Sequence, residues 1–264
     1  MSEMNVGQIG LTPITWTDYV GTVRNGDDIF SDGPEDIYKF SIDNQGRNIN
    51  LTLRDIASGK NATLQLYRDV NGNGRWDATD QAQGLLASSG NPGNSDESIS
   101  YRGAAAGGTY FARVYNYGSG TTYHLDLSGT LSNGSSYDRA SNLLPKEVAV
   151  GRLVSDRSFN SSVNDTNTTN TYAFSVSAPL FQRTKVDFIL NGLSNNADMR
   201  LVRDSNNNRI VDRGEVIASS MAGGISAEKI SASLSSGNYY LQVYQFSGNT
   251  NYNLTMDHKG TSFS

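Results

Sequence analysis

Apolar and polar residues alternate along many short segments of the chain. The clearest examples are Tyr38/Phe40/Ile42, Ile49/Leu51/Leu53, Ala62/Leu64/Leu66 and Val186/Phe188/Leu190. A period of two is typical of strands that bury one face, and Asn-Gly and Ser-Gly clusters interrupt the segments as turns do. No long window has the 3.6-residue period of a helix. The pattern predicts short β-strands, with at most a helical turn in Ala78–Ser88 and Gly214–Ser220.

The predicted strands fall into two copies of one motif, about 130 residues apart. Each copy ends with a Tyr-x-Leu-x-apolar strand, which begins at Tyr123 in the first and at Tyr252 in the second. Four further segments match in the same order: Tyr19–Val23 with Ala149–Leu153, Ile37–Ile42 with Thr171–Val176, Leu64–Asp69 with Met199–Asp204, and Gly108–Tyr115 with Gly237–Tyr244.

A stretch rich in Ser, Asn and Gly separates the copies, as expected for a linker. We therefore predict a first domain over residues 1–131, a linker over 132–146 and a second domain over 147–264. Several short strands in each domain of about 120 residues, with turns between them, favour an all-β fold. The prediction is two tandem antiparallel β-sandwich domains of jelly-roll type.

A twelve-residue polar loop directly follows a predicted strand in the first copy. Oxygen-bearing side chains stand at its first, third, fifth, ninth and twelfth positions, which is the spacing of an EF-hand calcium loop. Gly74 at the sixth position permits a sharp turn, and Trp76 at the eighth can anchor the loop to the core. The predicted calcium ligands are the side chains of Asp69, Asn71, Asn73, Asp77 and Asp80 and the main-chain carbonyl of Arg75.

The second copy keeps every oxygen position of this loop. Its twelfth residue is a glutamate, which can bind calcium through both oxygens, but Arg209 stands where glycine is expected. The predicted ligands are Asp204, Asn206, Asn208, Asp212, Glu215 and the carbonyl of Ile210. Asp-Asn-Gly strings also form ordinary β-turns, so the evidence for metal is that the spacing survives in both copies while the intervening residues change.

Composition narrows the classes of function. The 264 residues include no cysteine, which excludes disulfides, thiolate metal sites and thiol nucleophiles. The net charge of −5 argues against nucleic acid or anionic lipid as the main partner. No run approaches the roughly 20 apolar residues that cross a bilayer, so we expect no membrane insertion. Met1–Thr17 lacks the pattern of a secretory signal peptide.

Both copies contain the same strands in the same order, with an Asp-x-Asn-x-Asn loop and a late Gly-x-Tyr-x-apolar-x-Val-Tyr strand. Together these features resemble the bacterial pre-peptidase C-terminal (PPC) domain. The resemblance covers most of each copy and implies a β-sandwich module that often holds calcium. It also implies a link to secreted proteases and other exported or surface proteins. This chain departs from that setting because no protease domain accompanies the two copies.

Candidates for catalysis are few, and we predict that the chain is not an enzyme. The histidines are His124, in a predicted strand beside Tyr123, and His258 near the C-terminus. The sequence has no Gly-x-Ser-x-Gly elbow, His-Glu-x-x-His motif or phosphate-binding loop. An acidic cluster precedes the Tyr38 strand and consists of Asp27, Asp28, Asp32, Glu35 and Asp36. We prefer to interpret it as a solvated loop. The alternatives are a pair of catalytic carboxylates and a further calcium site.

Tyrosines concentrate on the late strands of both copies. Most are expected to pack in the core or at its rim, although an exposed row could bind a polysaccharide or an extended peptide. They are Tyr110, Tyr115, Tyr117, Tyr239, Tyr240 and Tyr244.

The leading hypothesis is a non-catalytic, extracellular or cell-surface binding or structural module stabilised by two calcium ions, with a polysaccharide or a surface protein as candidate partner. The alternatives are a cytoplasmic calcium buffer or sensor, and a polysaccharide- or matrix-binding accessory module of a secreted hydrolase system.

Overall fold

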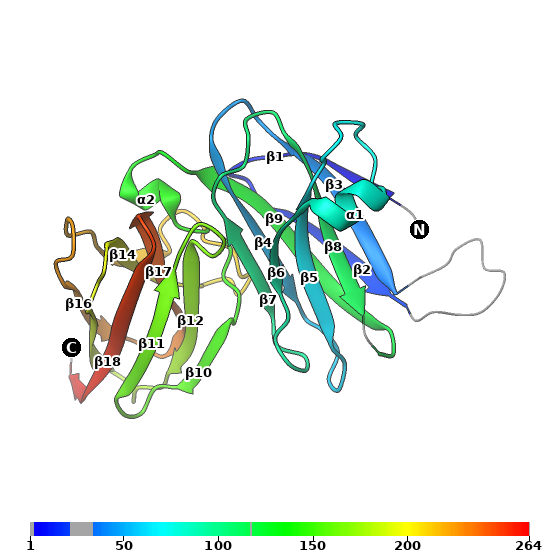
Figure 1. Cartoon of the computed structure of the whole chain (residues 1–264). Helices are drawn as coiled ribbons and strands as arrows, with labels where there is room; N and C mark the ends of the chain where they lie inside the picture. Colours follow the sequence, from blue (N-terminus) through cyan, green and yellow to red (C-terminus); the bar gives the residue numbers. More distant parts are fainter. Residues whose placement is uncertain (1–2, 22–33, 117, 264) are drawn as a thin grey trace. The chain divides into compact units, whose positions relative to one another are not determined.

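A computed structural model describes residues 3–21, 34–116 and 118–263 of the chain. The chain divides into two compact units, Met1–Asn133 and Gly134–Ser264. Strands dominate both units, as Figure 1 shows.

The described part of the first unit has nine strands and one helix. They are β1 (Glu3–Ile9), β2 (Ile14–Val20), β3 (Glu35–Ile42), β4 (Arg47–Arg54), β5 (Ala62–Arg68), α1 (Ala78–Gln83), β6 (Leu85–Ser89), β7 (Glu97–Tyr101), β8 (Thr109–Asn116) and β9 (Thr121–Leu131).

The described part of the second unit begins with a short helix and continues with nine strands. They are α2 (Ser136–Arg139), β10 (Val148–Arg152), β11 (Arg157–Val163), β12 (Thr169–Val176), β13 (Gln182–Asn191), β14 (Asn196–Arg203), β15 (Val216–Ser220), β16 (Glu228–Leu234), β17 (Gly237–Ser247) and β18 (Thr250–Phe263).

Each unit is a sandwich of two sheets with the same strand order. The first has the sheets β1-β3-β8-β5-β6 and β2-β9-β4-β7. In the second unit the orders are β10-β12-β17-β14-β15 and β11-β18-β13-β16, so every strand number is raised by nine. The tandem β-sandwich fold predicted from the repeat is confirmed. Gly214–Ser220, where a helical turn was considered, contains the edge strand β15, whereas Ala78–Ser88 does contain α1.

One pairing in each unit is parallel. β1 pairs with β3 and β10 with β12, and both pairings carry an irregularity next to a glycine, Gly7 or Gly151, with φ of 90° and 77°. The register makes Gly7 the counterpart of Gly151, because they face Phe40 and Phe174. The sequence match of Tyr19–Val23 with Ala149–Leu153 is therefore wrong: an apolar-Gly pattern recurs at the end of β2, but the true counterpart of β10 is β1.

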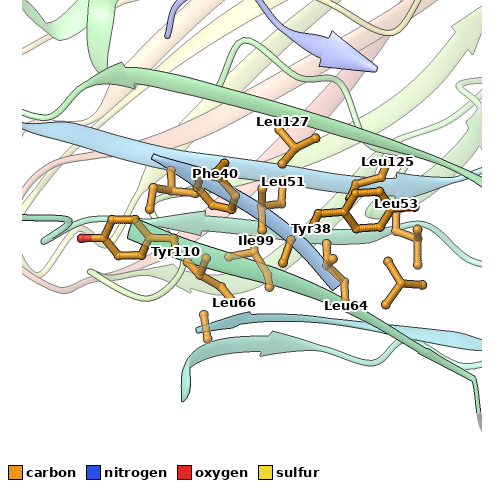
Figure 2. Close-up of a cluster of buried hydrophobic side chains, with 14 of the residues drawn as sticks. Tyr38, Phe40, Leu51, Leu53, Leu64, Leu66, Ile99, Tyr110, Leu125 and Leu127 are labelled. Atoms are coloured by element: carbon orange, nitrogen blue, oxygen red, sulfur yellow. The ribbon is translucent and has the colours of Figure 1, made fainter. Parts of the chain in front are cut away.

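Alternate side chains of both sheets meet in the core of each unit. Figure 2 shows this packing in the first unit, where Tyr38 and Phe40 of β3 lie among leucines of β4, β5 and β9. Leu51, Leu64 and Leu66 are fully buried there. The second unit has an equivalent cluster around Phe174, Phe188 and Leu241. The alternation in the sequence thus corresponds to real burial on the inner faces.

Part of the segment expected to be a linker packs onto the second unit. Leu143 pairs with Ile210, Leu144 N–H donates to the Arg209 carbonyl at 2.9 Å, and Leu144 is fully buried. Val211 N–H in turn donates to the Asn142 carbonyl at 2.8 Å. The polar composition of residues 132–146 concealed these contacts, which attach residues 142–144 to the second predicted metal loop.

Burying Leu51 contributes strongly to stability, so we expect Leu51→Ala to destabilise the first unit by about 2–5 kcal/mol. Leu85→Ala is a matched control, because Leu85 is 51% exposed and its truncation should cost about 1 kcal/mol or less. Both tryptophans, Trp16 and Trp76, lie in the first unit. Urea unfolding followed by tryptophan fluorescence therefore reports the stability of this unit, and equal midpoints for the two variants would contradict the assignment of the core.

A half-buried glutamate lies beside a tyrosine pair in the second unit. The hydroxyls of Tyr172 and Tyr252 are 2.8 Å apart, and the Glu147 carboxyl accepts the Thr171 N–H at 3.0 Å. Burial raises the pKa of Glu147 to about 7 from 4.5. The folded chain therefore holds this proton more tightly than the unfolded chain does.

Glu147 should make the stability of the second unit depend on pH. Its contribution is full below pH 4.5 and is lost as the pH rises toward 7, with a slope of at most about 1.4 kcal/mol per pH unit. Glu147→Gln keeps an oxygen for Thr171 but cannot titrate. Calorimetric melting between pH 4.5 and 7 should show that the wild type loses stability relative to Glu147→Gln as the pH rises. A difference in stability between the two proteins that does not change with pH would show that Glu147 is not the source of the pH dependence.

Candidate metal centres

The first loop begins where β5 ends and is shaped by its first residue. One oxygen of the Asp69 carboxylate accepts the Gly72 N–H at 2.8 Å, and the other accepts the Gly74 N–H at 2.7 Å. Both glycines have a φ of 68°, which a residue without Cβ adopts readily. Asp69 thus curls the chain around its own side chain, and the sharp turn expected at Gly74 forms.

Three of the predicted ligands gather in this loop. The amides of Asn71 and Asn73 each donate to the same oxygen of Asp77 at 2.8 Å. Hydrogen bonds from Asn71 first, and then from Asn73, lower the pKa of Asp77 to about 2. The Asn73 amide oxygen also accepts the N–H of Arg75, the predicted carbonyl ligand. Asp77 is therefore ionised at neutral pH and lies at the centre of a polar cluster.

The twelfth residue closes the loop. The Asp80 carboxylate accepts the Val70 N–H at 2.8 Å with one oxygen and the Asp77 N–H at 3.2 Å with the other. Asp77 reciprocates as the N-cap of α1, accepting the N–H groups of Thr79 and Asp80. This capping box fixes the end of the loop against the first turn of α1. Both oxygens of Asp80 therefore hold the main chain in place.

Trp76 anchors the first loop on the outer face of its sheet. Its ring lies 4.9 Å from that of Tyr67 and 5.4 Å from that of Phe111, centroid to centroid. Lys39 reaches across the same face, donating to the Gly74 carbonyl at 3.0 Å and pairing with Glu3 at 2.9 Å. The loop is thus held by aromatic packing and by an ion pair from β1 and β3.

The second loop, which follows β14, repeats the cluster of the first. The amides of Asn206 and Asn208 each donate to one oxygen of Asp212 at 2.8 Å. The N–H of Ile210, the predicted carbonyl ligand, donates to the Asn208 amide oxygen at 2.9 Å. The same three positions therefore converge in both units, although most of the residues between them differ.

Asp204 and Glu215 hold the two ends of the second loop. The Asp204 carboxylate accepts the N–H groups of Asn208 and Arg209, both at 3.2 Å. The Glu215 carboxylate accepts the N–H of Ser205 at 2.7 Å and that of Asp212 at 3.1 Å. Burial raises the pKa of Asp204 from its ordinary value. The longer Glu215 side chain closes the loop as Asp80 does in the first unit, without the help of a helix.

Two residues of the second loop have positive φ although they carry side chains. Asn207 has a φ of 57° and Arg209 a φ of 65°, at the positions of Gly72 and Gly74. Outside glycine this conformation costs roughly 1–2 kcal/mol per residue, with Asn penalised least. The bend expected at position 209 therefore forms despite the arginine, whose Nε donates to the buried Leu144 carbonyl at 3.0 Å.

The donor set of each loop suits a hard cation. In the described part of the chain, no three His, Cys, Asp or Glu side chains gather closely enough to hold a metal by themselves. Each loop adds neutral oxygens, from two Asn amides and from the main chain, to its carboxylates. Oxygen ligands of this kind suit calcium, which takes six to eight of them in flexible geometry.

The histidines and acidic residues noted in the sequence are engaged elsewhere. His124 Nδ1 lies 3.0 Å from an oxygen of Asp55, and His258 Nδ1 accepts the Gly260 N–H within β18. Glu35 pairs with Arg113, and Asp36 accepts the Tyr123 hydroxyl at 2.7 Å. Asp27, Asp28 and Asp32 lie outside the described residues.

The late-strand tyrosines do not form an exposed aromatic row in the described residues. Tyr115 is partly buried and lies under the Arg113 guanidinium, whereas Tyr117 is outside the described residues. The other four are buried: Tyr110, Tyr239, Tyr240 and Tyr244. The prediction that most of them pack in the core or at its rim is thus correct for these four.

In each unit, one buried glutamate holds together the loop between two strands, and we call this arrangement a carboxylate clamp. The sequence analysis did not predict it. Glu97 is fully buried and accepts the Ser89 hydroxyl at 2.5 Å and the Asn91 N–H. Glu228 binds Ser220 and the N–H of Ala222 in the same way. Each clamp closes the loop between two strands of different sheets. Its signal was present, because both copies have a serine eight residues before a glutamate.

Comparison with family models identifies the repeat. The model of the bacterial pre-peptidase C-terminal domain matches residues 34–116 and 154–245, more than half of the chain. The chain belongs to this family. Each unit contains one PPC domain, and β1, β2, β9, β10 and β18 lie wholly outside the matched segments. PPC domains are non-catalytic accessory domains that occur in secreted bacterial proteins.

Solved structures give distant likenesses. The PPC domain of a collagenase from Bacillus anthracis is 21% identical, with a TM-score of 0.32, over 44% of this chain and 96% of that domain. PliG from Aeromonas hydrophila, a periplasmic inhibitor of g-type lysozyme, is 11% identical, with a TM-score of 0.27, over 48% of this chain and 99% of its own. Comparison with curated proteins gives no match. In the described residues, both helices are too short to cross a membrane.

Asp80→Asn tests the closure of the first loop. Asparagine offers one acceptor oxygen where Asp80 uses two, so Val70 or Asp77 N–H loses its partner, and we expect a loss of about 0.5–2 kcal/mol. Hydrogen exchange should accelerate at residues 70 and 77. Gln81→Ala, an exposed change on the same helix, is the control. Unchanged exchange in Asp80→Asn would show that this carboxylate does not close the loop.

Proposed function

We propose that both loops bind calcium, and that the chain is a non-catalytic binding or structural module working outside the cell or at its surface. The proposal for location rests on the family, because PPC domains occur in secreted bacterial proteins. The proposal for calcium rests on the loops.

The observation that carries the calcium proposal is the repeated convergence of oxygen-bearing side chains. Two amides meet one aspartate in each unit, with all four amide-to-carboxylate distances at 2.8 Å. An ordinary β-turn needs no such cluster. The two copies share the predicted ligand positions of the loop, whereas most residues between these positions differ.

The amides can serve a cation by exchanging the main-chain N–H groups that their oxygens now accept for the cation. An Asn side chain carries an oxygen with two lone pairs and an NH₂ group, and rotation about its last bond exchanges them. In the present arrangement the NH₂ groups face the carboxylate of Asp77 or Asp212. A bound cation favours oxygens facing it. With three carboxylates per loop, we expect dissociation constants on the order of micromolar to millimolar.

The position of the loops favours stabilisation over signalling. The first loop and α1 connect β5 with β6, and the second connects β14 with β15, so each joins neighbouring strands of one sheet. Sensor EF-hands respond to calcium by changing the angle between paired helices. A loop between paired strands has no such movement available. Calcium should instead stabilise the folded state, by about 2.7 kcal/mol at a hundredfold excess over the dissociation constant.

Titration calorimetry on the metal-free full chain tests the proposal. We expect two calcium ions per chain, and one each for Asp77→Asn and Asp212→Asn, because each substitution removes the central carboxylate of one loop. Asp138→Asn, an aspartate outside the loops, should still bind two. Calcium should raise the melting temperature of the wild type but not that of the double variant. Absence of both heat and thermal shift in the wild type would refute calcium binding.

Tryptophan fluorescence can assign the two sites. Trp76 belongs to the first loop, and the other tryptophan, Trp16, packs near Tyr38 in the core. In a Trp16→Phe background, calcium should change the fluorescence of Trp76, and Asp77→Asn should abolish the change. Asp212→Asn should leave it intact. A signal that follows Asp212 would mean that the assignment of the two loops is wrong.

A further inference from the structure

The second unit contains a cavity of about 330 Å³ beside its metal loop. Ala173 and Tyr240 of its floor belong to the outer faces of β12 and β17, and the cavity also reaches Phe174 and Tyr239 of the core cluster. The cavity is lined by Lys146, Ala149, Gly151, Ala173, Ser175, Asn238 and neighbouring residues, with Asp204, Asn207 and Arg209 on the loop side.

The first unit fills the corresponding place with a long side chain. Lys39 faces Asn5 and Phe111 in the ladder of its sheet, as Ala173 faces Ala149 and Tyr240 in the second. Lys39 extends to its loop and donates to the Gly74 carbonyl. Ala173 has only a methyl group, so the second unit keeps open the space above this position.

The loop side of the cavity is built from the two residues with positive φ. Asn207 and Arg209 replace the glycines of the first loop while keeping their backbone conformation. Folding alone would favour glycine at both positions. Backbone strain of this kind is concentrated at functional sites. Both side chains line the cavity, and Asn207 accepts the amide of Asn238 at 3.0 Å across its wall.

The lining has the chemistry of a site for an acidic sugar. Two cations, Lys146 and Arg209, outnumber the single carboxylate of Asp204, which accepts main-chain N–H groups of its own loop. Asn207 and Asn238 offer amide groups to hydroxyls, and the small residues of the floor leave room for a flat, apolar ring face. The volume is at the lower end of that of ligand pockets.

We propose that this cavity binds a hexuronate, a sugar unit with a carboxylate, as found in acidic polysaccharides. Arg209 and Lys146 would bind the carboxylate, the two asparagines would bind hydroxyls, and the floor at Ala149 and Ala173 would lie against the ring. This site adjoins the metal loop, because Asp204 and Arg209 line the cavity, but the cluster of Asn206, Asn208 and Asp212 lies outside the lining. It is a further function of the second unit, because Lys39 occupies the equivalent space in the first.

Binding of methyl galacturonide to the full chain, followed by saturation-transfer NMR and calorimetry, tests the proposal. Titrations in calcium and in chelator separate this site from the metal loop, because galacturonide binding that persists in chelator needs no metal, whereas binding seen only with calcium would place the carboxylate on the metal and overturn the proposal. Methyl galactoside, which lacks the carboxylate, should bind at least about tenfold more weakly. N-acetylalanine supplies a carboxylate without a sugar ring and should also bind more weakly than the galacturonide.

Two variants place the ligand in the cavity. Arg209→Gly restores the glycine of the first loop and should weaken binding at least about tenfold, while the melting temperature stays within a few degrees because the strain at this position is relieved. Ala173→Lys should block the cavity as Lys39 does. Arg209→Lys keeps a cation and should retain part of the affinity. Lys229→Ala removes a cation elsewhere in the second unit and should leave binding unchanged.

Three results would overturn the proposal. The first is no saturation by methyl galacturonide up to about 20 mM in chelator. The second is equal binding by the wild type, Arg209→Gly and Ala173→Lys, which would place the sugar elsewhere. The third is preference for N-acetylalanine, which would indicate a site for peptide carboxylates.

Discussion

Burial of alternate side chains between two facing sheets is the interaction on which each unit depends. It orients the inner residues of β3, β4, β5, β8 and β9, and of their counterparts in the second unit, toward one core. It also fixes where each strand ends. Because β5 and β14 are paired on both sides within their sheets, the loop that follows each of them starts from a rigid position. The polar clusters of both loops form where they do because the apolar strands before them cannot shift.

The sequence was sufficient for features that depend on local pattern. The period of two located the inner faces, and the spacing of Asp, Asn and Asp located both loops, with Asn71, Asn73 and Asp77 meeting as expected. It was insufficient where a short pattern is ambiguous. An apolar-Gly dipeptide occurs in both β1 and the end of β2, and only the pairing with β3 identifies β1 as the counterpart of β10.

Features that arise from packing between distant segments could not be read from the sequence either. Leu143 and Leu144 lie in a polar stretch typical of linkers, yet they are buried against Arg209 and Ile210. The cavity of the second unit depends on Ala173 being small where Lys39 is long. The two residues can be recognised as counterparts only when the strand pairings of the two sheets are compared. Duplication has thus kept the inner faces and loops while the outer faces diverged.

The attachment of residues 142–144 to the second loop has a mechanical consequence. Their main-chain hydrogen bonds run to Arg209 and Val211, inside the loop itself. A tensile force that enters the second unit from its N-terminal side therefore acts on this loop before it reaches the β10–β12 ladder. A cation bound in the loop would then act as a mechanical clamp. Under the calcium proposal, the force at which the second unit begins to unravel would rise with calcium concentration.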